Sequence, residues 1–286
     1  MKPSLEAVLL MGQISDFPEA PEILTHFAHL VRQDDLDLRQ IETLFQGQME
    51  LEKKVLRIVN SRIYGFTHTL SHLSQAAVYV SVQEIYYWTV LCVMMDTFAG
   101  SHNTDYLKKD YWMHAVGCGV ATKEIARHMA YSHLGEAFLA GVLHDIGKLI
   151  WDKYLPQDLT KILQRVRSEN ILFVDSEQHM MHVTHADLGL WFVRHWELPS
   201  FLEGAIARHH HPQESSGQDL VIFMVHIADI LVRAMDIGNG GDEKIPVMNK
   251  SAWVLCGMNW AVLPSLCHRI DESFLQSEIL VNMAMH

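Results

Sequence analysis

The stretch Leu134–Trp151 reads LGEAFLAGVLHDIGKLIW and is apolar on nearly every side. A helix of this composition is expected in the middle of a protein rather than on its surface. Its polar residues His144, Asp145 and Lys148 then need partners, because an isolated buried charge is costly. The stretch therefore predicts a helical core with a polar site inside it.

Apolar residues recur at helical spacing along almost the whole chain, and no segment alternates with period two for long enough to demand a strand. We therefore predict an all-α fold, a multi-helix bundle. Proline and glycine positions suggest four parts. These are N-terminal helices (1–105), a helical core (106–235), a loop (236–250) and a C-terminal helical segment (251–286).

Composition limits the function classes. The 286 residues, 49% of them apolar, suffice for one large or two modest domains, and the net charge of −12 disfavours polymeric nucleic acid and acidic membranes as partners. The longest apolar run, Ile85–Met95, is shorter than the roughly 20 residues that cross a bilayer. The four cysteines have no Cys-x-x-Cys spacing, which suggests neither a disulfide framework nor a zinc-thiolate site. We expect a cytoplasmic protein.

Histidine is unusually frequent, with 19 residues, and it is a common metal ligand. In the opening stretch, His144 and Asp145 project to adjacent sides of one helix edge, and Lys148 lies one turn later. An imidazole beside a carboxylate suits a divalent first-row metal. The same residues also allow a purely structural arrangement, in which Asp145 pairs with Lys148 and His144 forms hydrogen bonds within the core.

Further residues of the types that bind metals lie beside apolar positions on other predicted helices. They are His114, His185, His209, His210 and Asp229. With His144 and Asp145, seven such residues occur on five helical segments. A polynuclear metal site inside a helical bundle requires this distribution of ligands.

Several motifs strengthen the pattern. They are Asp16-Phe17-Pro18, Ile58-Val59-Asn60-Ser61 with Tyr64-Gly65, Leu73-Ser74-Gln75-Ala76-Ala77, and Leu139 to Lys148. In these motifs, and in the order His, His-Asp, His, His-His, Asp, the chain resembles the HDOD domain. This is the HD-related output domain of bacterial signalling proteins, within the HD superfamily of metal-dependent phosphohydrolases. The resemblance runs from about Ile14 to Ala234 and implies an HD-type core with an N-terminal helical subdomain.

The resemblance also implies a ligand set. One metal ion would be held by His114, His144, Asp145 and Asp229, and Asp145 would bridge to a second ion held by His185, His209 and His210. Many HDOD domains have lost several of these ligands, whereas this sequence keeps all seven. Two or three divalent transition-metal ions are implied, with iron or manganese favoured and zinc or nickel also compatible with imidazole and carboxylate ligands.

Two such ions bind a phosphate oxygen and lower the pKa of a bridging water, so we expect hydrolysis of a small phosphoester, such as a nucleotide or cyclic dinucleotide. Asp145 and Lys148 are the expected catalytic residues, with Lys148 offsetting negative charge on the phosphate. Cyclic di-GMP itself is disfavoured. The related phosphodiesterase subgroup follows its His-His pair with a Glu and a Gly-Tyr-Pro loop, whereas this chain continues His211-Pro212-Gln213-Glu214.

A second hypothesis belongs to a different class. In it the chain is a non-catalytic signalling module, its metal ions hold helices together, and the N-terminal helices bind a signalling protein. The complete set of seven ligands favours the enzyme hypothesis. The frequent loss of activity in the family favours the signalling-module hypothesis.

Three smaller features have structural interpretations. The run Gly238-Asn239-Gly240-Gly241 follows no strand and carries no Gly-Lys-Ser/Thr, so a plain linker is expected there. His182 and His226 lie three residues before predicted ligands and are supporting residues or alternative ligands. The stretch from Asn60 to Gly65 is expected to be a helix C-terminal turn.

Overall fold

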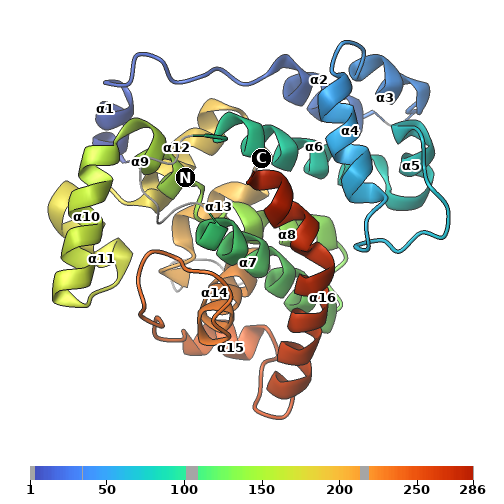
Figure 1. Ribbon diagram of the computed structural model, residues 1–286. Coiled ribbons are helices and arrows are strands. Elements are labelled where there is room, and N and C mark those ends of the chain that lie inside the picture. Colours follow the sequence, from blue (N-terminus) through green and yellow to red (C-terminus); the bar gives the residue numbers. More distant parts are fainter. Residues whose placement is uncertain (1–3, 34, 101–108, 213–218, 286) are drawn as a thin grey trace.

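The computed structural model describes residues 4–33, 35–100, 109–212 and 219–285, and it confirms the all-α prediction (Figure 1). The described residues contain no strand. Their helices are α1 (Leu5–Met11), α2 (Glu22–Val31), α3 (Arg39–Leu44), α4 (Met49–Val59), α5 (Leu73–Val80), α6 (Val82–Thr97), α7 (Lys109–His128), α8 (Leu134–Leu143), α9 (Ile146–Tyr154), α10 (Pro156–Glu169), α11 (Phe173–Met181), α12 (His185–His195), α13 (Phe201–Arg208), α14 (Leu220–Ala234), α15 (Lys250–Leu255) and α16 (Leu263–Ala284).

Helices α7 and α8 form the centre of the protein. Helix α7 packs against α8, α14 and α16, and it is buried along most of its length. Helices α2 to α6 gather at one end of the molecule, and α9 to α12 lie on the other side of α7 and α8 (Figure 1). The centre is therefore covered on several sides by helices that are distant in sequence.

The opening stretch is two helices rather than one, so the prediction of a continuous helix over Leu134–Trp151 is wrong. Helix α8 ends at Leu143, and α9 begins at Ile146 after a non-helical Asp145 with φ −101° and ψ 13°. The apolar composition continues across the break and gives no sign of it. The break places His144 and Asp145 at a corner between two helices, where both side chains reach one point in the interior.

Gly147 determines how closely the next helix approaches this corner. A Cβ atom at Gly147 would lie 1.9 Å from the carbonyl oxygen of His185. Thr184 fixes the start of α12 through a capping box with Asp187, so that His185 is the first residue of that helix. Contact between α9 and α12 at this glycine therefore brings His185 beside Asp145.

The stretch from Asn60 to Gly65 closes the loop between α4 and α5, with Gly65 at φ 63°. The Asn60 side chain donates to the Leu70 carbonyl oxygen at 2.9 Å and accepts from the Leu70 amide at 2.8 Å. Tyr64 donates to Glu84 at 2.6 Å and accepts from the Trp88 indole at 2.6 Å. The motif therefore attaches this loop to α6.

Some predictions fall outside the described residues. These are the boundary at 105–106 between the first two parts and the residues Gln213-Glu214 after the His-His pair. The four-part division stays a prediction. Helix α1 and Phe17 contact α12, and the Phe17 and Trp191 rings are 5.0 Å apart. This part of the predicted N-terminal region therefore packs on a helix of the predicted core (106–235).

No single helix among residues 4–33, 35–100, 109–212 and 219–285 is both long and apolar enough to cross a membrane. By length and composition only α5 and α6 taken together pass that test, and they are bent by 118°.

The close contact at Gly147 generates a stability prediction. Gly147→Ala should lower the free energy of unfolding by about 3 kcal/mol or more, because the new methyl overlaps the His185 carbonyl. Gly12→Ala is the matched control, since Gly12 has right-handed helical angles and a Cβ there would meet Val8 O at 3.2 Å. Urea denaturation measures both variants, and equal effects would contradict this account of Gly147.

Candidate metal centre

The structure brings all seven predicted ligands together. His114 comes from α7, His144 and Asp145 from the corner between α8 and α9, His185 from α12, and Asp229 from α14, while His209 and His210 follow the end of α13. Apart from His210, which is partly exposed, each of them is at most 3% exposed. They form two neighbouring groups.

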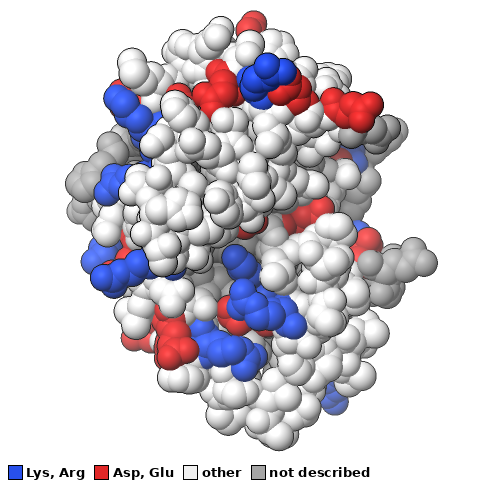
Figure 2. Space-filling model, turned by 90° about the vertical axis from the view of Figure 1, so that its right-hand side faces the viewer, with Lys and Arg blue, Asp and Glu red and all other residues white. Residues whose placement is uncertain are grey.

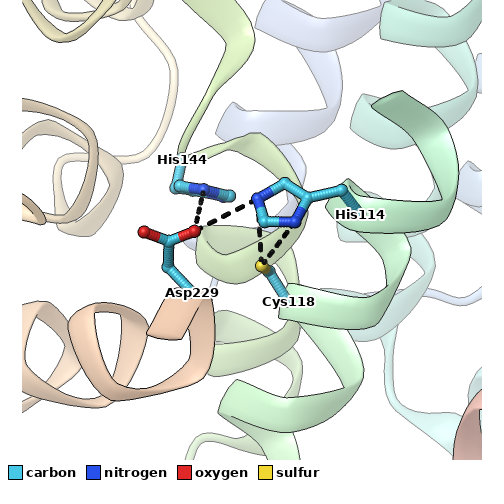
Figure 3. A group of neighbouring side chains, drawn as sticks. All are labelled: His114, Cys118, His144 and Asp229. Atoms are coloured by element: carbon cyan, nitrogen blue, oxygen red, sulfur yellow. Dashed lines mark hydrogen bonds and ion pairs between the residues drawn. The ribbon is translucent and has the colours of Figure 1, made fainter. Parts of the chain in front are cut away.

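The first group contains His114, His144 and Asp229, with Cys118 one turn after His114 (Figure 3). Asp229 Oδ1 lies 3.2 Å from His114 Nε2 and 4.0 Å from His144 Nε2. Cys118 Sγ lies 3.6 Å from His114 Nε2. Side chains of two helices, α7 and α14, and of the α8–α9 corner thus point toward one small volume.

The second group contains Asp145, His185, His209 and His210. Asp145 Oδ1 lies 3.0 Å from His185 Nε2 and 3.6 Å from His209 Nε2. His210 Nε2 lies 3.0 Å from His185 Nε2. This group is the part of the centre nearest to solvent, since His210 is its partly exposed member.

Asp145 faces both groups. Its Oδ2 atom lies 3.3 Å from His144 Nε2 and 3.7 Å from His114 Nε2, while its Oδ1 atom faces His185. A carboxylate with one oxygen toward each group is placed as a bridging ligand would be. Metal binding by these residues remains a prediction.

The imidazoles are held through their Nδ1 atoms. His144 Nδ1 donates to Gly141 O and His209 Nδ1 to Ile206 O, both at 2.8 Å. His185 Nδ1 donates to a carboxylate oxygen of Glu177 at 2.6 Å. In each neutral ring the Nε2 atom is then a lone-pair acceptor, which is the form that binds a metal.

The Nε2 atoms of His144 and His209 both lie close to the Asp145 carboxylate. His144 Nε2 and Asp145 Oδ1 are buried and have no hydrogen-bond partner among the described residues. Buried polar atoms are normally paired, so unpaired ones at a single point require an explanation such as an ion. The residues present therefore fit divalent cations.

Charge and burial set the protonation states. Burial raises the pKa of Asp145, but His144, Lys148 and His185 together hold that pKa well below its usual range. Burial lowers the pKa of His209 and His210, which keeps both imidazoles neutral. Burial also lowers the pKa of His185, but Glu177 and Asp145 raise it to about 8. Without an ion, His185 therefore holds a second proton at neutral pH, and a metal ion would have to displace that proton to bind Nε2.

Two buried cations complete the centre. Lys148 Nζ donates to Asp145 Oδ2 at 2.6 Å and to the Gly240 carbonyl oxygen. Arg233 Nε donates to Asp229 Oδ1 at 2.7 Å. Both contacts of the structural alternative are present, because Lys148 pairs with Asp145 and His144 forms a hydrogen bond in the core. Neither contact uses His144 Nε2 or Asp145 Oδ1.

Residues 236–249 cover the first group, so the prediction of a plain linker is wrong. A Cβ atom at Gly240 would lie 2.6 Å from Arg233 Nη2 and 3.3 Å from His114 Nε2. Asp242 fastens the segment by accepting from Arg233 Nη1 at 2.9 Å and from the Phe173 amide at 2.8 Å. We call residues 236–249 the covering loop.

Sequence reasoning missed four residues of the centre: Cys118, Glu177, Arg233 and Asp242. Arg233 has a local signal, since it lies one helical turn after Asp229. Glu177 lies eight residues before His185 on a different helix, and nothing in its neighbourhood marks it. Burial, Asp229 and Asp145 raise the pKa of Cys118 well above its usual range, so its thiol is neutral.

The two supporting candidates differ. His226 Nδ1 donates to His209 O at 2.7 Å, and its Nε2 accepts from the Asn249 amide at 3.0 Å. His226 therefore fixes the backbone of a predicted ligand and holds the end of the covering loop. His182 is exposed at the end of α11 and lies outside both groups.

Comparison with known proteins places this geometry among related folds. A family model of the HDOD domain matches residues 17–212. The solved structure of an HDOD domain protein from Geobacter sulfurreducens has a TM-score of 0.76 at 20% identity, covering 94% of this chain and 97% of that one. A candidate phosphohydrolase from Shewanella amazonensis has a TM-score of 0.75 at 17% identity, covering 98% of each chain. At these identities the likeness shows the fold alone.

A sequence relative is an uncharacterized protein of Treponema pallidum (strain Nichols). It is 24% identical over 244 residues, which is 84% of this chain and 46% of the relative. The chain thus spans about half the length of the curated relative that it matches.

The Glu177 contact predicts an effect on metal affinity. Glu177→Gln keeps the shape of the side chain but weakens its hold on His185, so metal affinity should fall by roughly 10- to 100-fold. The matched control is Glu169→Gln on the exposed end of α10. Competition with a chelator measures both variants, and equal affinities would show that Glu177 does not support a ligand.

Proposed function

Because the chain belongs to the HDOD domain family, we propose that it hydrolyses a small phosphoester with the help of divalent metal ions. The observation that carries this proposal is Asp145, whose two oxygens face two neighbouring groups of buried imidazoles. A carboxylate shared between two ligand groups would hold two ions close together, as two-metal phosphoester hydrolysis requires.

The predicted ligands would hold two ions in two groups. His114, His144 and Asp229 would hold one ion, and His185, His209 and His210 the other, with Asp145 shared. When bound, the ions supply Lewis acidity toward phosphate oxygens and lower the pKa of water. Imidazole and carboxylate ligands suit iron or manganese and are compatible with zinc or nickel.

The charges of the centre favour an anionic substrate once ions are bound. Without ions, the centre has four carboxylates and two cationic side chains. The carboxylates are Asp145, Glu177, Asp229 and Asp242, and the cations are Lys148 and Arg233. The carboxylates therefore exceed these cations by two. Two divalent ions would reverse this sign locally. A nucleotide or cyclic dinucleotide is then attracted to the centre although the whole chain carries −12.

Lys148 is the residue that would meet the phosphate. Its ammonium is fully buried, 5.1 Å from the centre of the Phe173 ring, and it donates to Asp145 and to Gly240 in the covering loop. Asp145 and Gly240 take two of the three N–H donors of this ammonium, so the third is left for a phosphate oxygen. Because the ammonium is fully buried, substrate access requires a shift of the covering loop or entry beside the partly exposed His210.

Activity tests the proposal directly. The manganese- or ferrous-loaded chain should hydrolyse an aryl phosphate diester, a nucleotide or a cyclic dinucleotide, and Asp145→Ala should lower the rate at least ~100-fold, because both ligand groups lose their shared carboxylate. Asp158→Ala, a partly exposed position on α10, is the control and should keep full activity. Activity that survives Asp145→Ala, or none on any of the three substrate classes, would contradict the proposal.

The covering loop generates a second prediction. Asp242→Asn removes the carboxylate charge that pairs with Arg233 and weakens the hold on the Phe173 amide. Loss of about 1.4 kcal/mol of charge-assisted hydrogen bonding should make extraction of the metal by a chelator ~10-fold faster. Asp236→Asn, at the start of the same loop, is the control, and the idea fails if both variants lose metal at the same rate.

A further inference from the structure

A second polar site lies where the N-terminal helices meet the core. It is a pocket of about 380 Å³ between the start of α6, the end of α7 and the start of α8, and none of the predicted metal ligands lines it. Figure 2 shows the face on which α5, α8 and α16 lie, and this face is hollowed where Lys and Arg side chains gather with Asp and Glu beside them. A volume of this size is typical of small-molecule pockets.

Most charged groups around this junction pocket are already paired. Glu136 accepts from the Tyr87 hydroxyl at 3.2 Å. Arg127 forms an ion pair with Glu124, which also accepts from the Ser273 hydroxyl at 3.0 Å. These groups form the walls of the pocket and need no ligand.

Lys123 differs from them. Among the described residues its ammonium has no hydrogen-bond partner and no carboxylate within ion-pair distance. Its stem lies beside Trp88 and Phe138, with which it lines two smaller cavities. Burial lowers the pKa of Lys123, and Glu84 acts in the opposite direction. Lys123 is thus half-buried and lines the junction pocket without an ion-pair partner.

Glu84 provides the opposite charge. Its Oε1 atom accepts from the Tyr64 hydroxyl at 2.6 Å, whereas its Oε2 atom accepts no hydrogen bond from the described residues. Glu84 and Lys123 attract each other across the pocket but stay too far apart to form an ion pair. The pocket thus presents one open cation and one open carboxylate oxygen.

We propose that the junction pocket binds a small zwitterion of the α-amino acid class. The carboxylate of the ligand pairs with Lys123 Nζ, and its ammonium group pairs with Glu84 Oε2. Helices α6 and α8 both begin at this pocket, and the partial positive charge of their N-termini adds to the attraction for the ligand carboxylate. The bridge satisfies both open charges at once, which neither a simple anion nor a simple cation does.

The junction pocket lies where a bound ligand could act on the metal centre through the helices. Helix α7 carries both Lys123 and the predicted ligand His114, and α8 runs from the pocket to Leu143, directly before His144. Two of the three helices that line the pocket, α7 and α8, therefore lead to the first metal group. An input of this kind is what a signalling domain needs.

The test uses the full chain, stripped of metal, with each of the twenty common L-amino acids as a separate probe. The rate at which Lys123 is acetylated by an amine-reactive reagent is followed by mass spectrometry, with Lys161 as the exposed reference. At least one amino acid should slow labelling of Lys123 several-fold and leave Lys161 unchanged. If none of the twenty protects Lys123, the proposal is overturned.

Variants separate this site from the metal centre. Binding of the protecting amino acid, measured by equilibrium dialysis, should be lost in Lys123→Met and in Glu84→Gln and kept in Lys161→Met and Asp145→Ala. Binding that survives Lys123→Met but fails in Asp145→Ala would place the ligand at the metal centre and overturn the proposal. If a pocket variant does not fold, the slowed acetylation of Lys123 in the wild-type chain is the result that decides for or against the proposal. Since every measurement omits metal, a failed hydrolase proposal leaves this one standing, and the reverse also holds.

Discussion

The buried carboxylate of Asp145 is the constraint on which the rest of the structure depends. It is 1% exposed, yet His144, Lys148 and His185 hold its pKa well below the usual range. A charge in such a place is stable only if several partners are delivered to it from separate segments. Three features bring these partners to Asp145. They are the corner between α8 and α9, the contact at Gly147 and the capping box that starts α12.

The charges of the centre are compatible with two states, one without metal ions and one with them. Without ions, Lys148 and Arg233 lie on the carboxylates, and a proton on His185 adds to their charge. With ions, the imidazole lone pairs and the shared carboxylate would bind metal, and Lys148 would no longer be needed to neutralise Asp145 alone. The covering loop contacts both cations, through Gly240 and Asp242. In the proposed function, metal binding, substrate contact and loop position are therefore linked through the same few hydrogen bonds.

Sequence predicted the all-α fold and the seven residues that meet, because ligand-type side chains within apolar helices are visible locally. It failed where three-dimensional neighbours decide. The break at Asp145 interrupts a stretch whose composition does not change, and Glu177 supports His185 from another helix without any local mark. The covering loop acts through the backbone carbonyl of Gly240, which no side-chain pattern reveals. The open pair of Lys123 and Glu84 likewise exists only because the start of α6 and the end of α7 line the same pocket.

The central claim is that Asp145 is shared by two metal ions. Metal analysis of protein purified without chelator, from anaerobic and metal-replete cells, tests it most directly when combined with anomalous diffraction at the metal edge. The account predicts two or three transition-metal ions per chain, with anomalous peaks on either side of the Asp145 carboxylate, and their loss in Asp145→Ala. Protein that contains no transition metal, or a single peak distant from Asp145, would contradict it.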